Sequence, residues 1–240
     1  TNAFHATFYA ANLWMAGKLQ DSVHMNAETF GTTYGYNDPL EFKAPSGPIM
    51  DSSAYPRYSY KWDRLWKVNA SDIIYHQNNW MNTGYQPIEV IKNWPGNGEI
   101  SSNQAWQLAP FFDNDNDGFY NPMAGDYPLI KGSQAVYFIY NDIRWQNYTD
   151  KPMGTEVHYM AYTYNCPQDS ALFNTVFIDY TIYNRSVNTY DSTYVGFWAD
   201  LDIGGSADDF IGCDVMRTSY YAYNGDSIDE GGNGVDGYLH

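Results

Sequence analysis

Two long runs of alternating aromatic and β-branched residues constrain the fold of this chain more than any other feature. They occupy residues 156–164 (EVHYMAYTY) and 175–183 (TVFIDYTIY). Such alternation is typical of β-strands that turn one face towards a core. Shorter runs of the same kind occupy residues 61–68, 135–140, 194–199 and 217–223. Because no long helical period accompanies them, we predict an all-β fold, an antiparallel β-sandwich or jelly roll with long loops and at most short helices.

One short helix is expected over residues 69–76, where Asn69 or Ser71 precedes Asp72 and two isoleucines. Such residues start helices by capping the first turn. The 240 residues suit one large all-β domain or two smaller ones. We divide them into a loop-rich β region with an acidic loop at 1–130 and the core strands of the sandwich at 131–240, together forming one unit. The chain is expected to be a piece of a longer polypeptide.

The overall charge narrows the choice of partners. The formal net charge is −16, and the 12 lysines and arginines are scattered. Nucleic acids and anionic membranes are recognised by clustered basic residues, so neither is an expected partner. No apolar run approaches the roughly 20 residues that a membrane span needs. The two cysteines, Cys166 and Cys213, form a disulfide in an oxidising compartment or remain two thiols, and the sequence leaves both alternatives open.

The most specific chemical signal is the stretch DNDNDG at residues 113–118. Asp113, Asp115 and Asp117 alternate, so their side chains can converge on one point, and Gly118 permits a sharp turn after them. The backbone carbonyl of Phe119 can add a further oxygen. Calcium takes six to eight oxygen ligands of this kind, and the stretch holds no Lys or Arg that would neutralise its carboxylates. We therefore predict a calcium site, against the simpler interpretation of a solvated turn built from good turn formers.

This loop is not an EF-hand. The twelfth position, where an EF-hand carries a closing glutamate, is Ala124. The nearest closing candidate is Asp126, with Asn121 as a helper. The predicted Ca²⁺ ligands are thus Asp113, Asp115, Asp117, Phe119, Asn121 and Asp126.

A second acidic cluster follows the run at 194–199. Its members are Asp200, Asp202, Asp208, Asp209 and Asp214. They form a second metal site, a polar loop that uses aspartate for its turns, or a pair of catalytic carboxylates like those of glycoside hydrolases. No nucleophile with a base, zinc motif or phosphate loop is recognised elsewhere, and the GxGxxG match at 232–237 has no helix after it. We therefore expect no enzyme and assign no catalytic residue.

The chain resembles a region found in large secreted proteins of Bacteroidota that are exported by the type IX secretion system. The resemblance covers most of residues 60–226 and is specific. Besides the acidic loop, it rests on Trp62-Asp-Arg-Leu-Trp-Lys-Val68, Asp72-Ile73, Leu108-Ala-Pro-Phe111, Tyr120-Asn-Pro122, Gly125-Asp-Tyr-Pro128, Lys131-Gly-x-Gln134, Tyr140-Asn-Asp142, Gly154-x-Glu156-Val-His158, Tyr194-Val-Gly-Phe-Trp198, Asp200-x-Asp202-x-Gly204, Asp208-Asp-Phe-Ile-Gly-Cys-Asp214 and Ala222-Tyr-Asn-Gly-Asp226. It implies an extracellular place on the outer face of the cell, as an adhesin or a module of a surface assembly, and no known reaction.

Exported proteins of this group commonly carry O-linked glycans on a serine or threonine. The modified residue follows an aspartate and precedes an aliphatic residue or a threonine. Modification requires that the serine be exposed. The resemblance therefore implies glycan attachment at the serines that match, which are Ser22, Ser170, Ser192 and Ser227.

Three functions follow from these features. The first is a calcium-stabilised structural or adhesive module of the cell surface, with other surface proteins, glycans, or components of outer-membrane secretion or surface assembly as partners. The second is a carbohydrate-binding module that stacks sugars on Trp80, Trp94, Trp106 or Trp145, although these rings equally suit packing under long loops. The third is a glycoside hydrolase built around Asp200.

Overall fold

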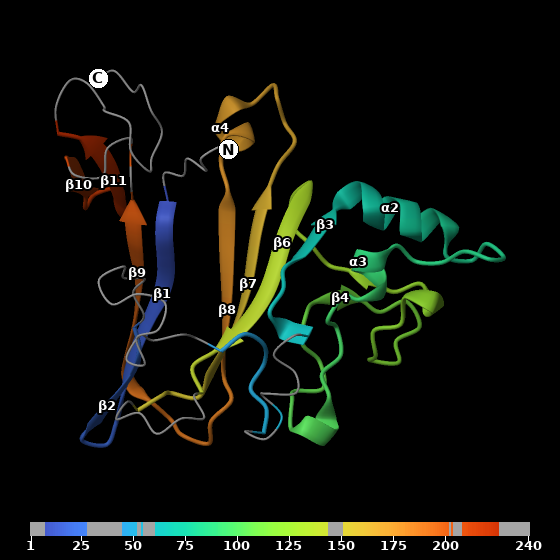
Figure 1. The fold of residues 1–240 in the computed structure, drawn as a ribbon, viewed down its shortest axis with the longest axis horizontal. Coiled ribbons are helices and arrows are strands. Elements are labelled where there is room, and N and C mark those ends of the chain that lie inside the picture. The colour runs from blue at the N-terminus through green and yellow to red at the C-terminus, as the bar shows by residue number, and fades with distance from the viewer. Residues whose placement is uncertain are drawn as a thin grey trace, which may run out of the picture. The chain divides into compact units, whose positions relative to one another are not determined.

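A computed structural model describes residues 8–27, 45–51, 54, 61–143, 151–201, 203 and 208–225 (Figure 1). They fall into two compact units: unit 1 takes the described residues of 1–43 and 190–240, and unit 2 those of 44–189. Unit 1 therefore joins segments from both parts of the chain that flank unit 2. The boundary expected at residue 130 lies inside unit 2, between β5 (Tyr127–Pro128) and β6 (Gln134–Asn141).

The described chain is mostly β-structure. Its other strands are β1 (Phe8–Leu19), β2 (Ser22–Asn26), β3 (Trp66–Asn69), β4 (Phe111–Phe112), β7 (Thr155–Thr163), β8 (Phe177–Asn184), β9 (Asp191–Leu201), β10 (Asp209–Asp214) and β11 (Ser219–Asn224). Its helical segments are α2 (Ala70–Asn79), α3 (Glu89–Lys92), α4 (Ser170–Phe173), η1 (Ile100–Ser102) and η2 (Pro122–Ala124). All strand pairs between these elements are antiparallel. The prediction of an all-β, sandwich-like fold with at most short helices is confirmed.

Most of the alternating runs form strands in the structure, as predicted. The runs at 135–140, 156–164, 175–183, 194–199 and 217–223 are β6, β7, β8, β9 and β11. The run at 61–68 was predicted wrongly in its first half, because residues 61–62 are helical and β3 begins only at Trp66. None of the described helices is long and apolar enough to cross a membrane.

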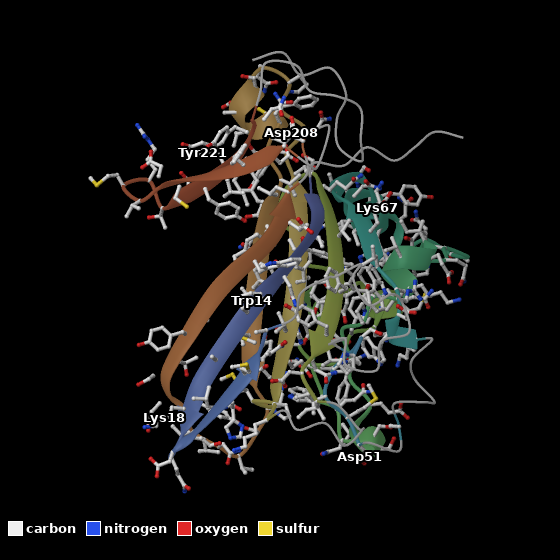
Figure 2. All side chains as sticks on the ribbon, turned by 60° about the vertical axis from the view of Figure 1, so that its left-hand side comes forward. Trp14, Lys18, Asp51, Lys67, Asp208 and Tyr221 are labelled. Atoms are coloured by element: carbon white, nitrogen blue, oxygen red, sulfur yellow. The ribbon has the colours of Figure 1, made fainter. Side chains whose placement is uncertain are left out.

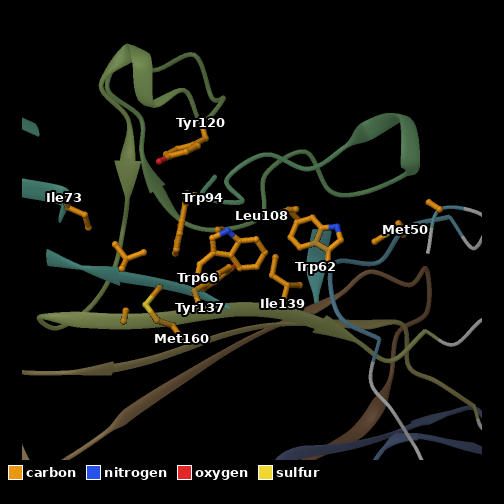
Figure 3. Packing of buried hydrophobic residues seen from close by; sticks show 14 residues of the cluster. Met50, Trp62, Trp66, Ile73, Trp94, Leu108, Tyr120, Tyr137, Ile139 and Met160 are labelled. Carbon is orange, nitrogen blue, oxygen red and sulfur yellow. The ribbon is translucent and has the colours of Figure 1, made fainter. Parts of the chain in front are cut away.

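The sheet of unit 2 has the strand order β3-β6-β7-β8, and its core lies on one face. Tyr137 of β6 stands opposite both Trp66 and Met160, so the three side chains share that face. Trp94, from the loop-rich region, packs on it with its ring centroid 5.0 Å from that of Tyr137 (Figure 3). The indole N–H of Trp94 donates to the carbonyl of Pro110 over 3.0 Å. Buried aromatic rings with satisfied polar ends thus anchor the loop-rich region on the sheet.

Helix α2 starts where the sequence predicts. Asp72 Oδ2 accepts the backbone N–H of the capping residue Asn69 over 3.2 Å and its side-chain amide over 2.8 Å. Asn69 Oδ1 in turn accepts from the side chain of Gln134 on β6 over 2.6 Å. The cap therefore stabilises the first turn and also ties the helix to the sheet. On its inner face α2 buries Ile73 and His76.

Unit 1 contains a three-stranded sheet of order β2-β1-β9 and the separate hairpin β10-β11 (Figures 1 and 2). Leu13 and Met15 of β1 are buried. Between them Trp14 points to the other face, where it stacks on Trp198 of β9 with centroids 6.3 Å apart. Strands β1, β2 and β10 were not predicted. Asn12 and Gly17 interrupt the alternation in β1, and β10 carries the residues that had been assigned to an acidic loop.

Candidate metal centre

The acidic loop is closed at its base by a short hairpin. It runs from Asp113 to Asp126, between β4 and β5, and Phe112 stands opposite Tyr127 in that strand pair. The rings of Phe112 and Tyr127 stack with centroids 4.8 Å apart. The two ends of the loop are therefore held together by residues that flank it, independently of the side chains within the loop.

The three alternating carboxylates converge as predicted. One oxygen each from Asp113, Asp115 and Asp117 lies within 4.8 Å of the others. Two left-handed backbone conformations curl the chain around this point, at Asn116 with φ 58° and at Gly118 with φ 81°. Among the described residues no second group of three His, Cys, Asp or Glu side chains is gathered in this way. The cluster can bind a metal ion.

The loop backbone already holds one oxygen of each carboxylate. The N–H of Gly118 donates to Asp113 Oδ2 over 2.8 Å, that of Asp117 to Asp115 Oδ1 over 3.3 Å, and that of Phe119 to Asp117 Oδ1 over 2.7 Å. The other oxygen of Asp113, Oδ1, is buried and has no hydrogen-bond donor in the described structure. Buried polar atoms nearly always have a partner. A bound cation would satisfy this oxygen.

Asp126 supports the loop from below and does not join the three carboxylates. Its side chain is fully buried, and its two oxygens accept the backbone N–H groups of Asn114 and Asn121 over 2.9 and 2.7 Å. Asn121 Oδ1 caps η2 by accepting the N–H of Met123 over 3.1 Å. Of the predicted ligands, the structure therefore brings Asp113, Asp115 and Asp117 together, and gives Asp126 and Asn121 a role in shaping the loop.

Two tryptophans lie against the glycines of the loop. A Cβ atom on Gly118 would lie 2.9 Å from the ring of Trp106, and one on Gly125 would lie 2.8 Å from the ring of Trp80. Both glycines have positive φ, 81° and 98°, a conformation that favours glycine. The loop is therefore shaped by contacts outside itself. Trp106 also packs edge-on against Phe119, with centroids 5.6 Å apart.

The electrostatics of the loop favour a cation. The pKa of the Asp115 carboxyl is raised, first by desolvation and then by the negative charges of Asp117 and Asp126, while the backbone N–H of Asp117 opposes this shift. Below the loop, burial lowers the pKa of His76 on α2, although the nearby Asp126 opposes this shift. No described lysine or arginine forms an ion pair with Asp113, Asp115 or Asp117.

The second acidic cluster does not form a comparable group in the described residues. Asp209 Oδ2 accepts the N–H of Ile203 over 2.9 Å, and Asp214 forms an ion pair with Arg217 across the β10-β11 turn. Asp200 and Asp208 are both half-buried, and Asp202 lies outside the described residues. The observed contacts are those of a polar turn, while the metal and catalytic alternatives stay untested predictions.

The remaining predicted residues are dispersed. Ser170 and Ser192 are exposed, Ser22 is half-buried at the start of β2, and Ser227 lies outside the described residues. Cys166 of unit 2 and Cys213 of unit 1 are both free thiols, and their pairing stays a prediction. Among the candidate stacking tryptophans, Trp94 is buried, Trp80 is half-buried and Trp106 is exposed. Trp145 lies outside the described residues.

The sequence did not reveal a buried polar network in unit 2. Glu156 Oε1 accepts from Arg185 Nη2 over 2.7 Å and lies 2.9 Å from Nε2 of His158. The other ring nitrogen of His158 lies 2.8 Å from the Tyr137 hydroxyl. Glu156 Oε2 accepts the backbone N–H of Ile49 over 2.8 Å. The one available signal was the placement of a glutamate and a histidine two residues apart in an otherwise apolar strand, which puts both on the same buried face.

Comparison of the chain with models of known protein families, with curated proteins and with solved structures found no match.

Proposed function

We propose that this protein is a calcium-stabilised structural or adhesive module of the bacterial cell surface. The observation that supports it is the convergence of Asp113, Asp115 and Asp117 within 4.8 Å of one another. Three carboxylates this close repel one another unless a cation lies between them. The loop that presents them is held in place by a hairpin, a buried carboxylate and two glycines packed on tryptophans.

The ligand set favours calcium over other metals. It consists of carboxylates, with the carbonyl of Phe119 as a predicted addition and no histidine or thiolate, so zinc and copper are poor matches. Magnesium requires near-ideal octahedral geometry, whereas calcium accepts six to eight oxygens in flexible arrangements. Asp115 and Asp117 are exposed, so water or a partner molecule can complete the coordination.

An ion in this loop would stabilise unit 2, because the loop leads directly into the core. Tyr120 is buried, and its hydroxyl donates to the carbonyl of Ile91 over 2.5 Å. The side chain of Asn97 pairs with the backbone of Tyr120 in both directions, over 2.7 and 2.9 Å. Ordering residues 113–117 therefore limits the motion of a core residue three positions further along the chain.

Two points support placement on the cell surface. One is the resemblance to type IX-secreted proteins, and the other is the calcium concentration that a weak site of this kind needs in order to be occupied. Weak calcium sites, with dissociation constants of about 10⁻⁴ to 10⁻³ M, are found in extracellular modules, where the ion is abundant. A loop with three aspartates and exposed coordination positions fits that class. Within this proposal the partners are other surface proteins, glycans, or components of the secretion and surface assembly.

Calcium titration of the metal-free protein tests the proposal. We expect saturable binding by calorimetry and a rise of the melting temperature with calcium, both lost in Asp115→Asn. Asp63→Asn is the matched control, because Asp63 is an exposed carboxylate of the same unit outside the loop. Binding that persists in Asp115→Asn, or a melting temperature that ignores calcium, would contradict the proposal.

A specific observation also supports carbohydrate binding. The Trp106 side chain is 48% exposed and forms a ring pair with Phe119 beside the carboxylates. Aromatic faces stack on sugars, and a surface calcium ion can accept sugar hydroxyls. A glycan array probed with and without calcium tests this function: binding that requires calcium and is lost in Trp106→Ala, while this variant still binds calcium as the wild type does, supports it. Absence of binding to any glycan favours the purely structural role.

A further inference from the structure

Unit 2 is an insertion in the chain of unit 1, which continues on both sides of it. The chain enters unit 2 through residues 45–49 and leaves it through residues 185–189, which follow β8. We call these two segments the neck of unit 2. Each sheet of the described chain is formed by strands of a single unit, and the buried cluster around Trp62 and Tyr137 consists of residues of unit 2. The neck therefore carries both covalent connections between unit 2 and the rest of the chain.

Both segments of the neck lie at the same end of the unit 2 sheet. Ser46 forms an antiparallel bridge with Tyr140 near the end of β6. Across the sheet, Tyr140 stands opposite Val157 of β7, and Val157 stands opposite Ile182 near the end of β8. The entering segment thus takes the place of an outer strand, three strand spacings from β8. At about 4.8 Å for each spacing, the two connections are about 14 Å apart.

Glu156 binds both segments of the neck with one carboxylate. Its Oε2 accepts the backbone N–H of Ile49, at the end of the entering segment, over 2.8 Å. Its Oε1 accepts from Arg185, the first residue of the leaving segment, with Nη2 at 2.7 Å and Nε at 3.1 Å. The Glu156 side chain is fully buried. Because a buried acceptor that loses its donor costs free energy, neither segment can leave the sheet without a penalty at Glu156.

Further contacts hold each segment separately. In the entering segment, the carbonyl of Gly47 accepts from the side chain of Asn141 on β6 over 2.9 Å. In the leaving segment, the backbone N–H of Arg185 donates to the carbonyl of Gly154 over 2.9 Å. A Cβ atom on Gly154 would lie 2.8 Å from that of Ser186, so the leaving segment packs closely on the start of β7. These contacts lie outside the acidic loop and do not depend on calcium.

The neck is also joined to the core of unit 2. His158 lies between the Glu156 carboxylate and the Tyr137 hydroxyl, at 2.9 and 2.8 Å. Tyr137 packs in turn against Trp94 of the buried cluster. The three residues Glu156, His158 and Tyr137 are all buried. An opening of the neck at Glu156 therefore disturbs the core, and we expect both to open together.

We propose that Glu156 and Arg185 form a clamp that closes the neck and makes unit 2 an autonomous insert, which opens as one cooperative body without requiring unit 1. A domain with its own core and few chain connections can open separately from its neighbour. The clamp also has a consequence for unit 1, because the insertion separates β1 from β9 in sequence. Closing a loop costs more entropy as the loop grows longer. A closed neck lets β1 and β9 pair as if a short connection joined them.

Native-state hydrogen exchange of the whole chain tests the autonomy of unit 2. Leu13→Ala removes a buried side chain of β1. We expect it to speed amide exchange in β1 and β9 at least about tenfold and to leave exchange in β6 and β7 unchanged. Glu156→Gln should speed exchange in β6 and β7 by a similar factor, with a smaller change in β1 and β9. Equal acceleration of both units by Leu13→Ala overturns the proposal.

The amide of Ile49 tests the clamp, because Ile49 touches Glu156 from the segment that does not contain Arg185. In the wild type this amide should exchange as slowly as those of β7. Arg185→Lys keeps the positive charge but loses the two-nitrogen contact, and it should speed exchange at Ile49 and in β7 by the same factor. Arg217→Lys is the matched control, because Arg217 forms an exposed ion pair in unit 1, and it should change neither.

Two results would overturn the clamp. One is an Ile49 amide that exchanges far faster than those of β7 in the wild type, because the entering segment would then fray without the sheet. The other is exchange at Ile49 that neither Glu156→Gln nor Arg185→Lys changes. Should Glu156→Gln leave unit 2 unfolded, the milder Arg185→Lys still decides between these outcomes.

Discussion

Unit 2 contains the buried carboxylate of Glu156 and the more exposed group of Asp113, Asp115 and Asp117, and the two differ in the source of their positive partners. Glu156 is fully buried and receives Arg185, His158 and the N–H of Ile49. Within the described residues, the exposed group receives backbone N–H groups from its own loop and no lysine or arginine. A buried charge must be matched within the chain, whereas an exposed cluster is free to take its cation from solution. This difference distinguishes a structural ion pair from a candidate metal site.

The largest effect should come from removing the buried charge. Glu156→Gln keeps the volume but leaves Arg185 without its counter-charge. Breaking a fully buried pair typically costs about 3–5 kcal/mol, and because the Arg185 side chain is 28% exposed we expect a loss near the lower end of that range. Urea unfolding measures the loss. Asp179→Asn is the control, because Asp179 forms a half-exposed pair with Lys131 and should change the free energy of unfolding little. Equal losses in the two variants would erase the distinction between the buried and the exposed carboxylates.

Removal of calcium should give the next largest effect. A ligand at 100 times its dissociation constant stabilises the native state by about 2.7 kcal/mol. Adding a chelator to calcium-saturated protein should remove a stabilisation of this order, seen as a lower melting temperature. Glu156→Gln should respond to the chelator as strongly as the wild type does, because the two carboxylate groups have separate partners. A variant that no longer responds would show that the two groups are coupled.

The exposed group could be predicted from the sequence and the buried network could not, because the two differ in how far apart their members lie along the chain. Asp113, Asp115 and Asp117 are close because they alternate along a few residues, a local property that spacing alone predicts. Besides His158, the partners of Glu156 come from positions 49 and 185, which lie 107 and 29 residues away along the chain and are brought together by the tertiary fold. Single-sequence reasoning does not determine that arrangement. Asp126 shows the limit within the loop itself, since its spacing predicted a ligand, whereas its buried oxygens accept the backbone N–H groups of Asn114 and Asn121 and lie outside the group of three carboxylates.

The same contrast holds for the strands. β6 and β7 place side chains in a core that contains several tryptophans, and their sequences predicted both strands. β8 was predicted by the same alternation, although none of its side chains is fully buried. β1 is the central strand of its sheet, yet Asn12 and Gly17 interrupt its pattern. Its strand state depends on pairing with β2 and β9, and pairing leaves no local signature.

A smaller effect should follow from crowding under the loop. Gly125→Ala puts a Cβ atom 2.8 Å from the Trp80 ring at a φ of 98°, and we expect a loss of about 2 kcal/mol from strain and displacement together. Gly84→Ala is the control, because Gly84 has a similar φ of 82° with nothing within 4 Å, so only the backbone strain of about 1 kcal/mol remains. Denaturant unfolding of both variants compares them. If Gly125→Ala also weakens calcium binding and Gly84→Ala does not, the contact with Trp80 helps to shape the site.

The smallest effect should appear on acidification. Burial alone would raise the pKa of Glu156, but its hydrogen bonds and electrostatic interactions with His158 and Arg185 outweigh this and lower the pKa below the ordinary value of 4.5. A carboxyl whose pKa is lowered by folding contributes stability that is complete above its unfolded value and is lost as the pH falls through the folded one. Burial raises the pKa of Asp142, so this group acts in the opposite direction, but it is present in both the wild type and Glu156→Gln. The difference in unfolding free energy between these two proteins should therefore shrink as the pH falls below about 5. A difference that grows on acidification would mean that the pKa of Glu156 is raised in the folded protein, and that Arg185 does not act as its internal cation.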